Sequence, residues 1–283
     1  MPERSRTRRR RRRSHFPTQL VLLCLVSAVA LVLILVYAFG AFSPEANAQP
    51  QATPSATVAP ATPTPEAPTP SPEATQSAVY DFSRPVPQSD PVDEHYFDDT
   101  VFIGDSRTEG LILYTGLSNA TNLTHKGLMV DTVFTKQVIN QNGQMVTVMD
   151  ALKNTQFSKV YIMLGINEMG WPYPETFIEK YSAILDAIRE INPDAIIYVQ
   201  EIMPVSQNVS DTHSYISNDK INQFNQLIQQ MTQKKEVYYL QVSQAVADSN
   251  GCLPQEAGSD GIHLTPAYCQ KWLDYLLCHT VTP

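Results

Sequence analysis

Residues 159–202 read KVYIMLGINEMGWPYPETFIEKYSAILDAIREINPDAIIYVQEI, and this stretch decides the fold class. It begins and ends with short apolar runs, at 159–164 and 195–202, whose lengths and β-branched content predict buried strands. Between them, residues 174–191 repeat apolar side chains at helical spacing, which predicts an amphipathic helix. A strand, a helix and a second strand at this spacing form a βαβ unit, so we expect a parallel sheet.

The same alternation continues on both sides of this stretch. Residues 100–103 and 237–242 read as further strands, and residues 218–235 read as a second amphipathic helix. An Asn-Gly dipeptide between apolar stretches predicts a local hairpin within residues 136–148. The expected fold is α/β, a three-layer α/β/α sandwich with a central parallel sheet of the flavodoxin-like kind. In such sheets the functional site lies at the carboxyl ends of the strands.

The first part of the chain differs in composition from the rest. Residues 1–19 form a basic tail, because eight of the chain's 20 Lys and Arg residues fall in the first 13 positions. Residues 20–42 are an uncharged, almost wholly apolar run, long enough as a helix to cross a hydrocarbon core of about 30 Å. Arginines before such a span favour a cytoplasmic N-terminus. We therefore expect a single-pass cell-membrane protein whose remaining residues lie outside the cytoplasm.

A cleaved signal peptide is the alternative to this transmembrane helix, since residues 46–48 have the small-x-small form of a cleavage site. The apolar run is longer than the roughly 7 to 15 residues of such signals, which favours the anchor. Residues 43–88 contain 11 of the chain's 21 prolines and are rich in Ala and Thr, so they are expected to be a disordered linker. The predicted catalytic domain then occupies residues 89–283.

Charge and cysteine content narrow the class of protein. Beyond the first 13 residues, 12 basic residues face 27 acidic ones, a formal charge of about −15 that argues against nucleic-acid binding. Cys269 and Cys278 are too far apart to pair if one helix carries both. A disulfide would then involve Cys252, and three free thiols are the alternative. No metal site or cofactor is expected.

Two distant segments carry the residues of a nucleophilic site. Residues 104–106, Gly-Asp-Ser, follow the first predicted strand, and residues 260–263, Asp-Gly-Ile-His, precede a predicted final helix. A serine becomes a nucleophile when a base accepts its proton, and the base needs an acceptor to fix its tautomer. Ser106, His263 and Asp260 supply these three roles.

Two further residues follow predicted strands at the same edge of the sheet. Asn167 comes after the strand at 159–164, and its amide can donate to an oxyanion; an Asn that stabilises its own turn is the alternative. Gly127 offers a backbone N–H after another predicted strand, although alone it reads as a turn glycine. We expect the oxyanion hole to consist of the N–H groups of Ser106 and Gly127 and the side chain of Asn167.

Together these segments resemble the SGNH/GDSL hydrolase superfamily, whose four blocks contribute Ser, Gly, Asn and His in that chain order. The resemblance covers residues 98–272, and the matching residues are Ser106, Gly127, Asn167 and His263. It implies that Ser106 is the nucleophile, His263 the base and Asp260 the orienting carboxylate. It also implies a serine esterase that acts on acyl esters through an acyl-enzyme intermediate.

The chain departs from the family pattern at two positions. Arg107 replaces the usual Leu after the serine, and Glu168 stands where many members have Asp. Arg107 suggests contact with an anionic or strongly polar substrate; a structural salt bridge is the alternative. Trp171 and Tyr173 follow the Asn167 loop and are candidate substrate-binding residues, as an apolar wall or a sugar-stacking platform. Packing beneath the loop is the alternative for both.

The expected substrate is an acyl ester. O-acetyl groups of envelope glycans are the first choice, because an anchored domain on a long linker meets surface carbohydrate; lipid and small-ester substrates are the other options. An acyltransferase that passes the acyl group to a glycan is the first alternative, since transfer and hydrolysis differ in how well the pocket excludes water. A non-catalytic glycan-binding ectodomain is the second. A bacterial envelope is favoured over a Golgi-type membrane because of the superfamily resemblance and the Pro/Thr/Ala-rich linker.

Overall fold

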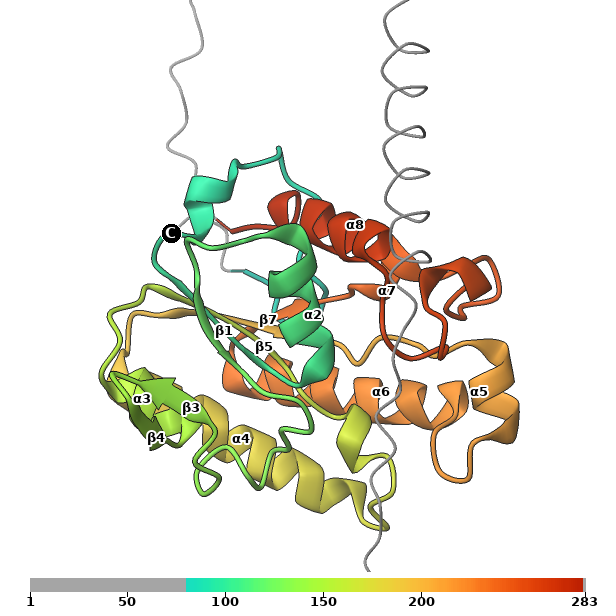
Figure 1. Ribbon diagram of the computed structural model, residues 1–283, viewed down its shortest axis with the longest axis horizontal. Coiled ribbons are helices and arrows are strands. Elements are labelled where there is room, and N and C mark those ends of the chain that lie inside the picture. Colours follow the sequence, from blue (N-terminus) through green and yellow to red (C-terminus); the bar gives the residue numbers. More distant parts are fainter. Residues whose placement is uncertain (1–79, 282–283) are drawn as a thin grey trace, which may run out of the picture. The chain divides into compact units, whose positions relative to one another are not determined.

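Five parallel strands form the central sheet of the computed structural model, which describes residues 80–281 (Figure 1). The strands are β1 (Thr100–Gly104), β2 (Thr121–Thr124), β5 (Lys159–Met163), β6 (Ile196–Gln200) and β7 (Tyr238–Leu240). Their spatial order is β2-β1-β5-β6-β7, and every neighbouring pair is parallel. With the hairpin strands set aside, this is the 2-1-3-4-5 order of flavodoxin-like sheets. The predicted α/β fold with a central parallel sheet is confirmed.

Helices cover both faces of the sheet, as Figure 1 shows. On one face lie α2 (Ser106–Thr115), α7 (Ser243–Val246) and α8 (Pro266–Leu277); on the other lie α3 (Val148–Lys153), α4 (Pro174–Ile191) and α6 (Asn218–Lys235). The connections contain α5 (Gln207–Thr212) and three 3-10 turns, η1 (Glu94–Phe97), η2 (Ile166–Glu168) and η3 (Gln255–Ala257). Both long helices, α4 and α6, have the bounds predicted from their apolar spacing.

Each face of the sheet packs into its own apolar core. All residues of β1 are buried; Val101 and Ile103 enter the core under α4 and α6, while Phe102 enters the core under α8. Successive side chains of a strand point to opposite faces. A strand covered on both faces therefore reads as a continuous apolar run, which is why the central strands could be predicted.

The predicted hairpin is present and lies outside the main sheet. Strands β3 (Ile139–Gln141) and β4 (Gln144–Val146) pair antiparallel. Asn142 and Gly143 join them with φ angles of 55° and 85°. Positive φ at both central positions is what a tight hairpin turn needs, and Asn-Gly supplies it with little strain.

The folded domain begins earlier than the predicted boundary at residue 89. Pro85 forms a parallel bridge with Tyr239, and Val86 is buried and donates its N–H to the Tyr239 carbonyl at 2.9 Å. Strand β7 is the edge of the sheet, so its unpaired backbone groups can bind an extended segment. The composition of residues 43–88 therefore does not show where the packed domain begins, because the last residues of this segment already pair with the sheet.

The predicted basic tail, transmembrane helix and most of the predicted linker, residues 1–79, lie outside the described residues. Within residues 80–281, none of the helices has both the length and the apolar character that a membrane span requires. Cys252, Cys269 and Cys278 are free thiols, so this part of the chain contains no disulfide.

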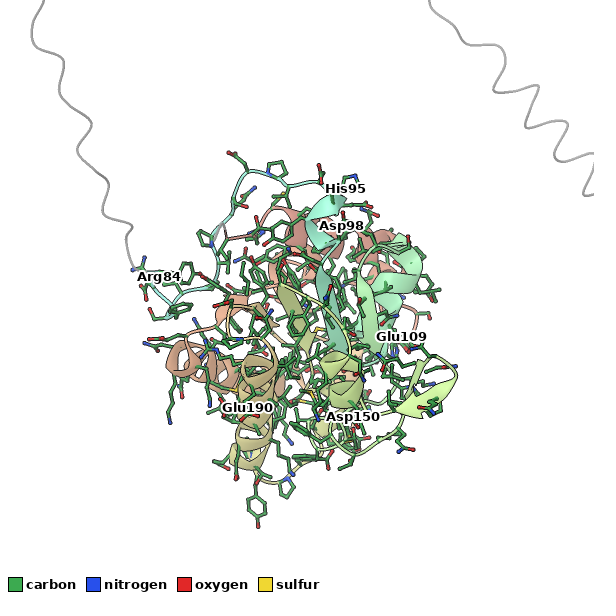
Figure 2. The ribbon with its side chains drawn as sticks, turned by 90° about the vertical axis from the view of Figure 1, so that its left-hand side faces the viewer. Arg84, His95, Asp98, Glu109, Asp150 and Glu190 are labelled. Carbon is green, nitrogen blue, oxygen red and sulfur yellow. The ribbon has the colours of Figure 1, made fainter. Side chains whose placement is uncertain are left out.

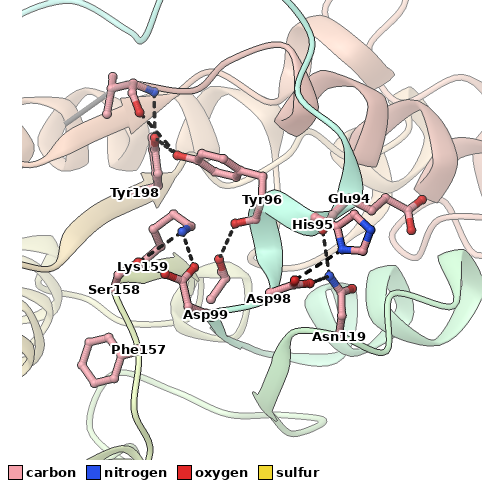
Figure 3. A network of polar contacts seen from close by, with 12 residues as sticks. Glu94, His95, Tyr96, Asp98, Asp99, Asn119, Phe157, Ser158, Lys159 and Tyr198 are labelled. Carbon is pink, nitrogen blue, oxygen red and sulfur yellow. Dashed lines mark hydrogen bonds and ion pairs between the residues drawn. The ribbon is translucent and has the colours of Figure 1, made fainter.

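A polar network holds the amino ends of the strands, at the opposite edge of the sheet from Ser106 (Figure 3). Lys159, at the start of β5, pairs with Asp99 just before β1, and its ammonium lies 4.7 Å from the centre of the Tyr96 ring. The Tyr96 and Tyr198 hydroxyls are 2.8 Å apart. These contacts link η1 to the starts of β1 and β5.

Exposed acidic side chains surround the domain. Figure 2 shows Glu109 on α2, Asp150 on α3 and Glu190 on α4, and each of them is exposed. His95 Nδ1 lies 3.3 Å from a carboxylate oxygen of Asp98 at the surface. This surface matches the acidic composition of the chain beyond its basic tail.

Candidate active site

Ser106 is the first residue of α2 and lies directly beyond the carboxyl end of β1. Gly104 is required before it, because a Cβ at that position would lie 2.1 Å from the Thr108 hydroxyl and 2.9 Å from the Met163 carbonyl. Asp105 caps the helix by accepting the Arg107 N–H at 2.9 Å. The Ser106 N–H has no acceptor among residues 80–281, as is usual in the first turn of a helix.

The loop before α8 brings His263 and Asp260 to this serine. The Ser106 Oγ lies 2.9 Å from His263 Nε2, and His263 Nδ1 lies 2.6 Å from an oxygen of Asp260. The other Asp260 oxygen accepts two backbone N–H groups, from Ile262 at 2.9 Å and from His263 at 2.8 Å. Three residues separated by as many as 157 positions therefore form one continuous hydrogen-bonded chain.

The charge of Asp260 sets the direction of the proton relay. Partial burial acts to raise the pKa of Asp260, but the hydrogen bonds from His263 and Ile262 outweigh it and lower the pKa to about 2. The carboxylate is thus an acceptor, so His263 Nδ1 carries the proton that it donates to Asp260. The remaining ring nitrogen, Nε2, is free to accept the Ser106 proton.

Packing against Ser206, the N-cap of α5, fixes the Asp260 loop. Gly261 has a φ of 70°, and a Cβ there would lie 2.1 Å from the Ser206 hydroxyl. The Ser206 N–H donates to the Gly261 carbonyl at 2.8 Å. At the other end of the loop, the Thr265 N–H donates to the Ala257 carbonyl at 2.6 Å. Only glycine fits at position 261, which places Asp260 and His263 on a tightly held turn.

Asn167 lies in η2, beyond the carboxyl end of β5, and β5 is the strand next to β1 in the sheet. Gly165 makes this turn with a φ of 137°, and a Cβ on it would lie 2.3 Å from the Ile202 side chain. The Asn167 amide nitrogen donates to the Leu128 carbonyl at 3.1 Å and lies 3.5 Å from an Asp105 oxygen. The second contact is too long for a strong hydrogen bond, so that amide hydrogen is available to an oxyanion.

Gly127 lies in the loop after β2, and its φ of 73° confirms the turn geometry. The loop is attached to the end of β1 by the His125 N–H, which donates to the Gly104 carbonyl at 3.0 Å. Asn167 holds it through Leu128. The Gly127 N–H donates to no described residue. The structure thus brings the Gly127 loop and Asn167 together at one sheet edge, and their role as an oxyanion hole stays a prediction.

Arg107 does not point into the solvent beside the nucleophile. Its side chain is 3% exposed, and Nη1 donates to the Met203 carbonyl at 2.7 Å. Its other guanidinium nitrogens have no hydrogen-bond partner among the described residues, and no carboxylate there lies within ion-pair distance. Burial lowers the pKa of Arg107 to about 10, against the attraction of Asp105 and Asp260. Its burial argues against the expected contact with substrate. The absence of a described carboxylate within ion-pair distance argues against a direct salt bridge.

Trp171 and Tyr173 differ in their surroundings. Trp171 is partly buried and packs against the core under α4 and α6, as its packing alternative predicts. Tyr173 is 68% exposed immediately before α4 and is free to contact a ligand. A third aromatic side chain, Tyr215, lies over Gly170 and is also exposed; no sequence pattern marks this tyrosine as a site residue.

Glu168 is the residue of this site whose environment differs most from the expectation for its type. Its sequence signal is only the departure from the Asp that many members of the family have at this position. Its side chain is 0% exposed, and Oε1 accepts the Val130 N–H at 2.7 Å. Burial raises the pKa of Glu168 to about 8.

Comparison with known proteins assigns this geometry to a family. The model of the GDSL-like lipase/acylhydrolase family matches residues 102–270, more than half of the chain. The chain belongs to this family. It is therefore a serine hydrolase of the GDSL type that acts on ester bonds, and the match spans Ser106, Asn167 and His263. The search of curated proteins found no match.

Solved structures resemble this chain at low sequence identity, and one of them has a TM-score above 0.5. A protein from Streptococcus pneumonia named for platelet activating factor is 22% identical with a TM-score of 0.51, over 65% of this chain and 88% of its own. A GDSL-like lipase from Bacteroides thetaiotaomicron is 14% identical with a TM-score of 0.48, over 67% and 87%. A carbohydrate esterase family 3 protein from Talaromyces cellulolyticus is 20% identical with a TM-score of 0.42, over 62% and 93%.

Proposed function

We propose that this GDSL-type hydrolase is a membrane-anchored esterase that removes O-acetyl groups from glycans of the cell envelope. The observation that carries the proposal is the hydrogen-bonded chain from Ser106 through His263 to Asp260, open to solvent at the imidazole. Ser106 Oγ attacks the ester carbonyl as His263 Nε2 accepts its proton. The negative charge that forms on the carbonyl oxygen is stabilised by the N–H groups of Ser106 and Gly127 and by the Asn167 amide.

The second half of the reaction uses the same residues in reverse. Protonated His263 donates to the leaving alcohol, which leaves an acyl group on Ser106. A water molecule then attacks this ester while His263 accepts its proton. As the C–O bond to Ser106 breaks, His263 returns this proton to Ser106 Oγ, and acetate is released. Asp260 stays ionised throughout and stabilises the imidazolium.

Solvent access supports hydrolysis over transfer to another sugar. The side chain of His263 is 47% exposed and that of Asp260 is 51% exposed. An acyltransferase has to keep water away from its acyl-enzyme, because water outnumbers any glycan acceptor. An imidazole that is half exposed gives water direct access to the position from which it attacks.

The hollow next to Asp260 supports the proposal that the acyl group is attached to a hydrophilic molecule such as a carbohydrate. It has a volume of about 460 Å³ and includes Asp260 and Gly261 in its lining. Most of the other lining side chains are polar, among them Ser206, Gln207 and Asn208. A long acyl chain favours an apolar channel, whereas hydroxyl-rich carbohydrate favours side chains of this kind.

The proposed location rests on residues 1–42, with their basic tail followed by an apolar run. A domain held outside the cytoplasm on the proline-rich linker meets surface polymers rather than cytoplasmic metabolites. Protease added to intact cells tests this part of the proposal. The catalytic domain should be cut from the outside, and complete protection in intact but not in lysed cells would contradict it.

Acetate release tests the substrate. The purified full chain should release acetate from O-acetylated wall polymer, and the Ser106→Ala variant, matched in amount, should release none. Activity on p-nitrophenyl acetate should exceed activity on the octanoate ester by at least about tenfold. Hydrolysis of p-nitrophenyl acetate with no acetate released from any wall polymer would leave the esterase assignment intact and overturn the glycan proposal.

A further inference from the structure

Glu168 is a buried acidic residue directly after Asn167. It is the last residue of η2, and its side chain is 0% exposed. A carboxyl group is stable in such a place only when hydrogen bonds replace its water. One oxygen, Oε1, accepts the Val130 N–H at 2.7 Å, and the other has no partner among residues 80–281. The mechanism proposed above does not use this group, so its burial needs another explanation.

The contacts of Glu168 and Asn167 converge on one segment, residues 125–130, here called the Gly127 loop. Asn167 donates to the Leu128 carbonyl at 3.1 Å, and Glu168 accepts the N–H of Val130, two residues further on. At its start, the loop is attached to the end of β1 by the His125 N–H. Gly127 therefore lies between an attachment to β1 and two attachments to η2.

Packing does not fix the Gly127 loop at Gly127 itself. A Cβ built on Gly127 would meet nothing within 4 Å, and its φ is 73°. The position of its N–H consequently depends on its neighbours: the hydrogen bonds on either side, the turn in which the Leu128 N–H donates to the His125 carbonyl, and the buried side chains of Leu128 and Val130. An oxyanion donor has to be held to within about 0.5 Å of its productive position, and loops reach that precision only when neighbouring groups lock them.

We propose that Glu168 is a positioning residue that holds the Gly127 loop so that the Gly127 N–H points into the oxyanion hole. This inference rests on the proposed function, since it assumes ester hydrolysis at Ser106. Glu168 acts through Val130 and does not touch the substrate. Its role is to place an acceptor oxygen at the distance that the length of its side chain sets. No proton transfer by its carboxyl group is involved.

The buried environment fits an acceptor that is neutral at physiological pH. Burial raises the pKa of Glu168 to about 8, and the negative charges of Asp105 and Asp131 act in the same direction against the bond from Val130. A neutral carboxyl still accepts an N–H through its carbonyl oxygen. It places no negative charge beneath the site where the oxyanion forms.

Three substitutions in the full chain separate this role from others. Glu168→Gln keeps an acceptor oxygen at the same length, Glu168→Asp withdraws it by one methylene, and Glu168→Ala removes it. With p-nitrophenyl acetate, kcat should fall in the order Gln, Asp, Ala, with Gln within about threefold of wild type and Ala lower by about 10- to 100-fold. KM should stay within about threefold in all of them, because ground-state binding does not involve the oxyanion.

The outcomes are distinguishable. A Glu168→Ala variant with the wild-type kcat would overturn the proposal, and so would a Gln variant that loses more activity than Asp, since that order indicates acid chemistry. Thermal unfolding of each variant checks folding. Should Glu168→Ala fail to fold, the comparison of Gln with Asp still decides, because each differs from Glu by a single group or methylene.

Hydrogen exchange tests the positioning separately from catalysis. Deuterium uptake by a peptide that covers the Gly127 loop should be faster in Glu168→Asp than in Glu168→Gln, which should match wild type. Equal uptake in all three would overturn the inference. Wild-type protein that hydrolyses no ester would instead overturn the proposed function, while the exchange result would still report whether Glu168 holds the loop.

Discussion

Asp260→Asn isolates the electronic role of the carboxylate from its structural one. The Asn oxygen can still accept the backbone N–H groups of Ile262 and His263, which lie 2.9 and 2.8 Å from Asp260. Its NH₂ group then faces His263 Nδ1, so the imidazole has to carry its proton on Nε2. That is the nitrogen that must accept from Ser106, 2.9 Å away.

The size of the effect follows from the exposure of the pair. Removing this acceptor from a deeply buried triad lowers kcat by about 10⁴-fold. Here the Asp260 side chain is 51% exposed, so water partly replaces the carboxylate. We therefore expect a loss of about 10³-fold in kcat, which corresponds to about 4 kcal/mol in the activation free energy.

Steady-state kinetics with p-nitrophenyl acetate, together with thermal unfolding, measures both parts of this prediction. Asp260→Asn should change KM by less than about threefold and the free energy of unfolding by less than about 1 kcal/mol. Asp260→Ala is the matched control: it should lose similar activity and also unfold at a lower temperature, since it lacks the side-chain oxygen that accepts both backbone N–H groups. An Asp260→Asn enzyme within tenfold of the wild-type kcat would refute the reasoning about the tautomer.

Three other perturbations test the site and its support. Asn167→Ala should lower kcat by about 10²- to 10³-fold with little change in KM, as steady-state assays will measure. Gly165→Ala should lower the free energy of unfolding by about 2 kcal/mol or more in urea, because its Cβ would lie 2.3 Å from Ile202 at a φ of 137°; an unchanged midpoint would contradict this. Raising the pH from 4.5 to about 8 should lower the free energy of unfolding, because buried Glu168 keeps the proton that the unfolded chain releases. Denaturation of Glu168→Gln across that range should show a flatter dependence.

Much of the fold could be predicted because it depends on local pattern. The spacing of apolar residues in α4 and α6 set the bounds of both helices, and Asn-Gly set the turn between β3 and β4. The start of the domain could not be predicted in this way. Residues 85 and 86 bind the edge of β7, and only the assembled sheet creates that edge.

The same distinction applies to the site. Asp260 and His263 share one loop, so their contact follows from a spacing of three residues. The contact between Glu168 and Val130 joins residues 38 positions apart, and nothing in either segment indicates it. Arg107 was placed next to the substrate because it adjoins Ser106, yet its side chain points into the protein. Neighbours on a helix face different directions, and sequence proximity alone does not say which faces the cleft.

The central claim is that Ser106 becomes acylated with His263 as its base. Rapid quenching of the reaction with an acetyl ester, followed by mass spectrometry of proteolytic peptides, tests it most directly. The account predicts one acetyl group on the peptide that contains Ser106, formed during turnover and absent from both the Ser106→Ala and the His263→Ala variants. Turnover that continues in Ser106→Ala, or an acetyl group found only on another residue, would contradict the account.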